Sequence, residues 1–167
     1  RKRVPDNRIY ISRRKELDDY NFRSNTVYSD EEHLSACITW LQHAQNINTG
    51  GGVSAMYHID TQSCDADYPE TTGYIIPTFL CYHHYTGDNA YKESAIAMGD
   101  WEISIQDIDG GVGEPAGVYG LRPRVFNTAQ VILGWLSLYK NTENYKYLEA
   151  ASKAGDWILS KQDSDGK

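Results

Sequence analysis

The chain contains one segment twice, first from Tyr91 and again from Tyr147. The copy that starts at Tyr91 reads Tyr-x-Glu-x-Ala-x3-Gly-Asp-Trp-x2-Ser-x-Gln-Asp-x-Asp-Gly, and the copy that starts at Tyr147 has the same residues. A fainter copy comes earlier, in which Trp40 and Gln45 take the places of Trp101 and Gln106. The spacing between the two copies, from Tyr91 to Tyr147, is long enough for two helices and two loops. Repeating units of this kind stack on one another. The repeat therefore predicts an all-α domain of stacked antiparallel helical hairpins.

The repeated residues have a structural interpretation. A Trp packs between neighbouring helices, and a Gln near a helix end can satisfy free carbonyl groups of that end or of the next hairpin. The Asp-Gly pair that follows ends the helix and turns the chain. We therefore assign Trp101, Gln106, Trp157 and Gln162 to the stacking of the repeats and not to catalysis.

Caps and apolar periodicity predict five helices. Ser29 and Glu32 form a capping box for the first, which is expected to end at Gln45–Asn48, before three glycines. The other four are expected over these ranges: Thr71 or Thr72 to Tyr85, about Asn89 to Gln106, Asn127 or Thr128 through Tyr139, and about Asn144 to Lys161. Pro77 lies inside the second, where a kink or a delayed start is expected.

Charge divides the chain into two parts. Half of the 16 Lys and Arg residues lie in the first 23 positions, whereas the net charge of the whole chain is −7. We therefore expect a basic irregular arm over residues 1–29 and a helical domain over residues 30–167. A nucleic-acid partner needs basic residues on the folded body, so none is expected. No apolar run in the sequence is long enough to cross a bilayer as a helix, which argues against a membrane span.

Cysteine and metal-ligand spacing give no sign of a cofactor. Cys37, Cys64 and Cys81 have no paired spacing, and a reducing cytoplasm is the default interpretation. Cys81 and His84 share a helical face, but a third zinc ligand at useful spacing is absent from the sequence. A glycine-rich phosphate loop followed by Lys-Ser or Lys-Thr is absent as well. The expected cofactor and metal are none.

The Trp-x4-Gln-x3-Gly pattern on paired helices resembles the α/α toroid superfamily, which includes six-hairpin glycoside hydrolases, polysaccharide lyases, sugar epimerases and, with a related motif, terpene cyclases. Four segments look like one poorly characterised group of toroid proteins linked with bacterial polysaccharide metabolism: Gly50–Ser54, Tyr68–Thr78, Arg122–Val131 and Gly134–Leu136. The resemblance covers about residues 30–167. It implies an incomplete ring of about half the hairpins, so we expect a homo-oligomer or a missing second half as partner, beside a carbohydrate ligand.

In rings of this type the loops before the inner helices meet at one mouth. Loops 48–72 and 107–127 therefore should converge. The first loop supplies Tyr57, His58, Asp65, Asp67, Tyr68 and Glu70, and the second supplies Asp109, Glu114, Tyr119, Arg122, Arg124 and Asn127. The expected catalytic residues are Glu70, His58, Tyr57 and Arg122. The expected substrate-binding residues are Tyr68, Thr72, Tyr74, Tyr119, Arg124 and Asn127.

Two chemistries fit this set. Carboxylates that face each other across a cleft can serve as acid and base in glycoside hydrolysis. Alternatively, Arg122 or Arg124 holds a uronate carboxylate while Tyr57 or His58 removes the proton at C5, which gives a lyase or an epimerase. Each residue also has a structural interpretation, such as a first-turn Glu70 that favours the helix dipole.

The function that the sequence favours is a carbohydrate-active protein acting on a polysaccharide or oligosaccharide, of the hydrolase, lyase or epimerase type. One alternative is a non-catalytic helical-repeat module that binds a glycan or a protein in the same groove. A third possibility, an isoprenoid cyclase relative, is the weakest, because a denser run of Asp residues is expected there.

Overall fold

The computed structural model describes residues 27–113 and 122–166. Residues 36–167 form one compact unit and residues 1–35 form another, and each is described by itself. Most of the expected basic arm therefore lies outside the described residues. In the smaller unit the predicted capping box is confirmed. The backbone N–H of Glu32 donates to Ser29 Oγ at 3.2 Å, and the Ser29 N–H donates back to Glu32 Oε2 at 2.8 Å.

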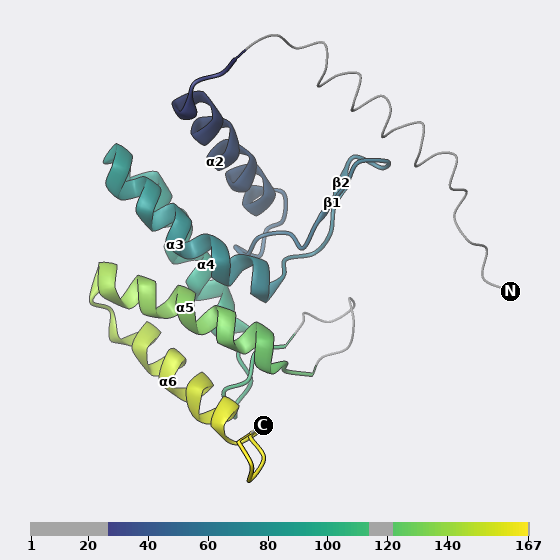
Figure 1. Ribbon diagram of the computed structural model, residues 1–167, viewed down its shortest axis with the longest axis vertical. Coiled ribbons are helices and arrows are strands. Elements are labelled where there is room, and N and C mark those ends of the chain that lie inside the picture. The colour runs from purple at the N-terminus through teal and green to yellow at the C-terminus, as the bar shows by residue number, and fades with distance from the viewer. Residues whose placement is uncertain (1–26, 114–121, 167) are drawn as a thin grey trace, which may run out of the picture. The chain divides into compact units, whose positions relative to one another are not determined.

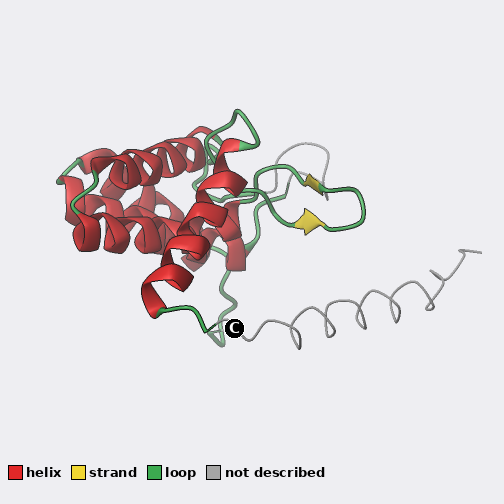
Figure 2. Cartoon of the chain, turned by 90° about the horizontal axis from the view of Figure 1, so that it is seen from above, coloured by secondary structure: helices red, strands yellow, loops and turns green. Residues whose placement is uncertain are grey.

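The described residues form helices and one short hairpin of strands (Figures 1 and 2). The elements are α2 (Asp30–Asn46), β1 (Tyr57–His58), β2 (Ser63–Cys64), α3 (Pro69–Thr86), α4 (Asn89–Ser104), α5 (Val125–Thr142) and α6 (Tyr145–Leu159). In the larger unit α3 and α4 form one helical hairpin, α5 and α6 form the next, and α3 packs along α5 (Figure 1). The predicted all-α architecture of stacked hairpins is confirmed. None of the helices in the described ranges is both long enough and apolar enough to cross a lipid bilayer.

Two inner helices begin earlier than predicted. Helix α3 starts at Pro69 instead of Thr71 or Thr72, because a proline at the first helical position has no N–H to leave unpaired. Helix α5 starts at Val125, two or three residues before its predicted start at Asn127 or Thr128. The residues before them, Tyr68 and Arg124, are extended and provide no side-chain cap. Pro77 is accommodated inside α3.

Buried threonines in the first turns of α3 and α5 hold the loops that come before these helices. The Val53 N–H donates to Thr72 Oγ1, and the Val112 N–H donates to Thr128 Oγ1, each at 2.9 Å. Both threonines are fully buried. The Thr72 hydroxyl also donates to the Tyr68 carbonyl at 2.8 Å. Thr72, which the sequence places among substrate-binding residues, is thus an anchor of its own loop.

The repeated glutamines join α2 to α4 and α4 to α6, and we call these three the outer helices and α3 and α5 the inner helices. Gln45 Nε2 donates to the carbonyl oxygens of Gly51 at 3.2 Å and Ser94, on α4, at 2.9 Å. Gln106 repeats this pattern, because its Nε2 donates to the carbonyl oxygens of Gly110, in its own loop, and of Ala150, on α6, each at 3.0 Å. Each glutamine therefore closes its own loop and reaches forward to the next hairpin, which confirms the structural role predicted for this position.

The repeated tryptophans pack on the glycine-rich loop of the preceding hairpin. The Trp101 ring lies against Gly52, where an added Cβ would come within 2.6 Å of the ring carbon Cε3. Trp157 lies in the same way against Gly111, with an added Cβ 2.6 Å from Cε2. Glycine is required at both places because any side chain would occupy the volume of the indole.

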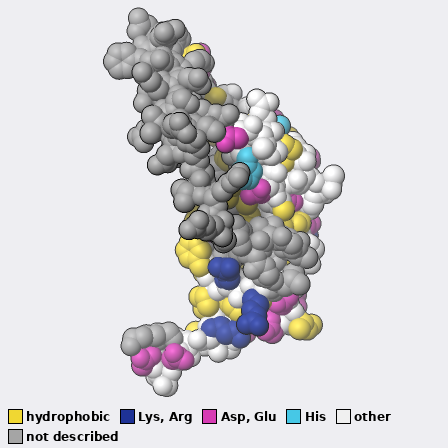
Figure 3. Space-filling model, turned by 90° about the vertical axis from the view of Figure 1, so that its right-hand side faces the viewer, with side chains coloured by type: hydrophobic (Ala, Val, Ile, Leu, Met, Phe, Trp, Pro, Cys, Tyr) yellow, Lys and Arg dark blue, Asp and Glu magenta, His cyan; other side chains and the backbone are white. Residues whose placement is uncertain are grey.

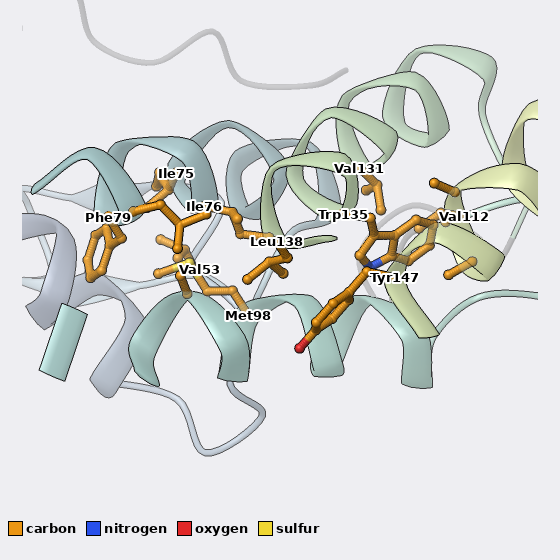
Figure 4. Packing of buried hydrophobic residues seen from close by; sticks show 14 of the residues in the cluster. Val53, Ile75, Ile76, Phe79, Met98, Val112, Val131, Trp135, Leu138 and Tyr147 are labelled. Carbon is orange, nitrogen blue, oxygen red and sulfur yellow. The ribbon is translucent and has the colours of Figure 1, made fainter. Parts of the chain in front are cut away.

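The core of the larger unit lies between the two hairpins (Figure 4). Its largest apolar side chains come from α3 to α6 and are Ile76, Phe79, Leu80, Met98, Trp135, Leu138 and Tyr147. Val53 and Val112 enter it from the loops before α3 and α5. Trp135 is fully buried, and its Nε1 donates to the Gly99 carbonyl of α4 at 3.1 Å. This bond ties the second hairpin to the first.

Helix α4 also buries a carboxyl group. Glu102 is fully buried, and neither of its carboxylate oxygens has a hydrogen-bond partner within the described residues. Burial raises the pKa of Glu102 well above its ordinary value, because the ionised form is desolvated. Above the unfolded-state pKa the unfolded chain releases this proton while the folded protein retains it, so the contribution of Glu102 to stability falls as pH rises.

Replacing this carboxyl is expected to stabilise the fold. At about pH 7 Glu102→Met should raise the free energy of unfolding by about 1–3 kcal/mol, the usual cost of a buried polar group without a partner. The gain should shrink as the pH is lowered towards about 4.5, where the unfolded chain also binds the proton. Urea unfolding at both pH values measures it. Glu149→Met, at an exposed position of α6, is the matched control and should change stability little at either pH.

Candidate functional site

The two predicted loops meet where α3 and α5 begin. The N-terminal ends of both helices lie at the end of the unit that also carries the β1–β2 hairpin (Figure 1). There Asn127 Nδ2 donates to the Tyr68 hydroxyl at 3.4 Å, which joins residues 59 positions apart. Asn127 is only 2% exposed. We call this region, at the first turns of α3 and α5 and the loops before them, the mouth.

Close packing of α3 on α5 fixes the width of the mouth. A Cβ added at Gly73 would lie 2.7 Å from the Gln130 carbonyl oxygen and 3.0 Å from the Val131 nitrogen. These are backbone atoms of α5, which cannot move aside as a flexible side chain can. Glycine at position 73 therefore lets the two inner helices approach directly below the Tyr68–Asn127 bond.

The β1–β2 hairpin presents His58 with a carboxylate partner. His58 Nε2 lies 2.8 Å from Asp65 Oδ1, and the two side chains are 45% and 34% exposed. The pairing of His58 with Ser63 on the opposite strand holds the backbone of this segment. An imidazole held by a carboxylate and open to solvent is an arrangement that can accept a proton from a ligand.

Tyr57 lies beside an aromatic residue of α2. Its ring centroid is 5.1 Å from that of Trp40 in an edge-to-face arrangement. Successive residues of a strand project to opposite faces, so Tyr57 and His58 do not serve the same ligand face. The sequence identified Trp40 only as a member of the fainter copy of the repeat, and its contact with Tyr57 was not predicted. The Trp side chain is 47% exposed.

The base of the hairpin is held by a buried polar cluster. Asp67 is buried and accepts a hydrogen bond from Asn48 Nδ2 at 2.8 Å. Asn48 Nδ2 is also within 3.0 Å of Ser54 Oγ and of the Asp65 carbonyl. Asp67, one of the loop carboxylates noted in the sequence, is thus occupied inside the loop. Asn48 has no signal in the sequence beyond its place before the glycines.

The remaining predicted residues are distributed along the mouth. Glu70 is half-buried in the first turn of α3, and Tyr74 is 49% exposed one turn further on. Arg122 and Arg124 are both exposed on the segment that leads into α5. On the face drawn in Figure 3 the described basic side chains gather in one small area with acidic side chains close by. Tyr119 and Glu114 lie outside the described residues.

Among the described residues, side chains that could ligate a metal do not gather in groups of three. Over residues 27–113 and 122–166 no three His, Cys, Asp or Glu side chains come together as a possible metal site. The three cysteines are free, and Cys81 lies exposed on α3. His84, its predicted neighbour on that face, instead has Nε2 2.6 Å from Asn141 Oδ1 on α5.

Comparison with known proteins connects the fold to one solved structure. Neither the protein-family models nor the curated proteins give a match. The structure resembles that of a protein described as Polysaccharide Lyase BACCELL_00875, with a TM-score of 0.68 and 14% sequence identity. The similarity covers 81% of this chain and 22% of that one. At this identity the likeness establishes the helical fold, and the chain spans about a fifth of the length of the protein it resembles.

Proposed function

We propose that this chain forms part of the substrate mouth of a carbohydrate-active protein, and that the reaction is the eliminative cleavage of a uronate-containing polysaccharide. The observation that carries the proposal is the Asn127–Tyr68 hydrogen bond. It brings the loop that bears His58 and the segment that bears Arg122 to one end of the stacked hairpins. The fold of the similar structure, which is described as a polysaccharide lyase, supports the same class of substrate.

In the proposed reaction the arginines bind and His58 moves a proton. A guanidinium of Arg122 or Arg124 holds the uronate carboxylate in a bidentate pair and stabilises the negative charge that develops on it. His58, oriented by Asp65, takes the proton from C5. The electrons of the C5–H bond form the C4–C5 double bond, and the C4–O bond breaks with its electron pair on the departing oxygen, which then takes a proton.

The described geometry favours His58 over Tyr57 as the base. Tyr57 packs edge to face on Trp40, whereas His58 has an aligned carboxylate and 45% of its side chain exposed. Tyr68, positioned by the bond from Asn127, then contacts the sugar next to the reacting one, with Tyr74 one turn along α3. Glu70, in the first turn, belongs to the same wall and would be the acid in the hydrolytic alternative.

The proposed site is formed by this chain together with further helical hairpins. The chain spans 22% of the polysaccharide lyase that it resembles, so further hairpins, from a second copy or from a second half of the ring, would complete the wall of the mouth. Activity is therefore expected of the complete assembly that contains these residues.

The test is the ultraviolet absorbance of the unsaturated uronide that elimination produces. Polygalacturonate, alginate and a glycosaminoglycan serve as substrates for the assembled protein. His58→Ala should lower kcat by about 10²–10⁴-fold, the usual contribution of a general base. Arg122→Ala should raise KM for the uronate substrate, because the carboxylate loses its partner.

His84→Ala is the matched control, since this exposed histidine lies near the opposite end of α3. It should leave kcat and KM unchanged. Turnover of the same substrates by His58→Ala at the wild-type rate would contradict the assignment of the base. Glycan binding by the wild type without an unsaturated product, or release of reducing ends without that absorbance, would replace elimination by a binding role or by hydrolysis.

A further inference from the structure

A hollow lies between α2 and α4, and its wall includes the start of the loop that leads to the mouth. It has a volume of about 420 Å³, within the range of small-molecule sites. The C-terminal turns of α2 and the loop after it form one side, and the first half of α4 forms the other. The polar side chains that line it include Gln42, Gln45, Asn46, Asn48, Glu93 and Ser94. None of the residues proposed to bind or convert substrate at the mouth lines it.

Gln45 lines this hollow, and its carboxamide is largely buried. Its side chain is 5% exposed, and its Nε2 is already bonded to the Gly51 and Ser94 carbonyl oxygens. Its Oε1 is buried and has no partner among the residues that the structure describes. A buried amide oxygen without a donor costs about 1–3 kcal/mol, a cost that the two Nε2 hydrogen bonds of Gln45 accompany in this orientation of the carboxamide.

The second copy of the repeat has larger residues at two positions that line the hollow in the first copy. Ala90 and Ala97 line it, and the equivalent positions of the second copy are Lys146 and Lys153. A lysine side chain at either alanine would extend across the space between the outer helices. Gln45 and Gln106 make equivalent hydrogen bonds to the next outer helix. The small residues of the first copy nevertheless leave the space between the helices open.

The chemistry of the lining selects the class of ligand. Carboxamides and a serine hydroxyl offer both donors and acceptors, as do the hydroxyl groups of a sugar. Among the described residues that line the hollow, only Glu93 is charged, and its carboxylate disfavours an anion such as a uronate. The alanines offer little apolar surface to a hydrophobic ligand.

We propose that the hollow between α2 and α4, which Gln45 lines, binds a neutral saccharide unit. It is a site separate from the mouth and independent of the reaction there. A neutral sugar in it would be held by hydroxyl groups that donate to Glu93 and accept from the carboxamides of Gln42 or Asn46.

The test replaces Ala97 of the first copy with lysine, the residue at the equivalent position, 153, of the second copy. Cellotriose, mannotriose and trigalacturonate are the probes, and binding is measured by saturation-transfer NMR and by isothermal titration calorimetry on the full chain. Wild type should bind one of the two neutral trisaccharides and not trigalacturonate at this site. Ala97→Lys should weaken that binding at least about tenfold, a loss of about 1.4 kcal/mol.

Ser152→Lys, at an exposed position of α6, is the control for an added lysine and should bind as wild type does. Both positions are exposed and helical, so the two variants should unfold at the same urea concentration as wild type. Arg122→Ala should retain the neutral-sugar signal, which separates this site from the mouth. Equal affinity of wild type and Ala97→Lys, or the lack of a signal with both neutral probes, would overturn the proposal.

Discussion

Gly110→Ala is expected to destabilise the larger unit by about 3 kcal/mol or more. Gly110 has φ = +104°, where an L side chain is strained by about 1–3 kcal/mol. An added Cβ would also meet the carbonyl oxygen of Lys153 and lie 2.7 Å from its carbonyl carbon. Those atoms belong to the backbone of α6, so the loop and the helix must separate, at a further cost of about 1–3 kcal/mol. Urea unfolding followed by circular dichroism measures the loss.

Gly87→Ala is the matched control for this prediction. Gly87 ends α3 with φ = +76° and has no heavy atom within 4 Å of an added Cβ. It therefore tests the backbone conformation without the collision, and about 1 kcal/mol is expected. Equal losses for Gly110→Ala and Gly87→Ala would show that the loop does not press on α6 as described.

Trp135→Ala is expected to cost about 3–5 kcal/mol, the range for truncation of a large buried aromatic residue. Its indole is fully buried between the hairpins and carries the Nε1–H that bonds to the Gly99 carbonyl. Trp135→Phe keeps most of the volume and loses only this bond, so a loss of about 1–3 kcal/mol is expected. Far-ultraviolet circular dichroism during urea unfolding measures both, because removal of a tryptophan changes the fluorescence signal.

Trp40→Ala tests the same truncation at an exposed tryptophan. Trp40 is 47% exposed and its ring lies beside the rings of Tyr57 and His43, so a loss of less than about 1 kcal/mol is expected. A large loss from Trp40→Ala, or a small one from Trp135→Ala, would place the core of this unit elsewhere than between α3, α4, α5 and α6.

The repeat made the architecture predictable to the level of single contacts. Gln45 and Gln106 occupy equivalent positions, and a Gln near a helix end has few structural roles, so the forward bond to the next hairpin could be anticipated. The five helices followed from the same periodicity. Their starts were less certain, because Pro69 and Val125 begin helices without a side-chain cap that would mark the boundary.

The candidate site was predictable only as two loops that meet. The sequence could not distinguish a hydroxyl that faces a ligand from one that holds a loop, and Thr72 proved to hold the loop through Val53, 19 residues before it. The β1–β2 hairpin also escaped prediction, because strands of two residues are too short to show an alternating pattern. The choice between His58 and Tyr57 depends on that hairpin.

The forward reach of Gln45 has a consequence for the order of events during synthesis. Its amide closes the loop at Gly51 almost at once, but its second acceptor, on Ser94, lies 49 residues further along the chain. At a ribosomal rate of about 5–20 residues per second, this delay is roughly 2–10 s. A nascent chain therefore holds each outer helix by local bonds alone until the following hairpin has emerged, and a chaperone has that interval in which to bind it.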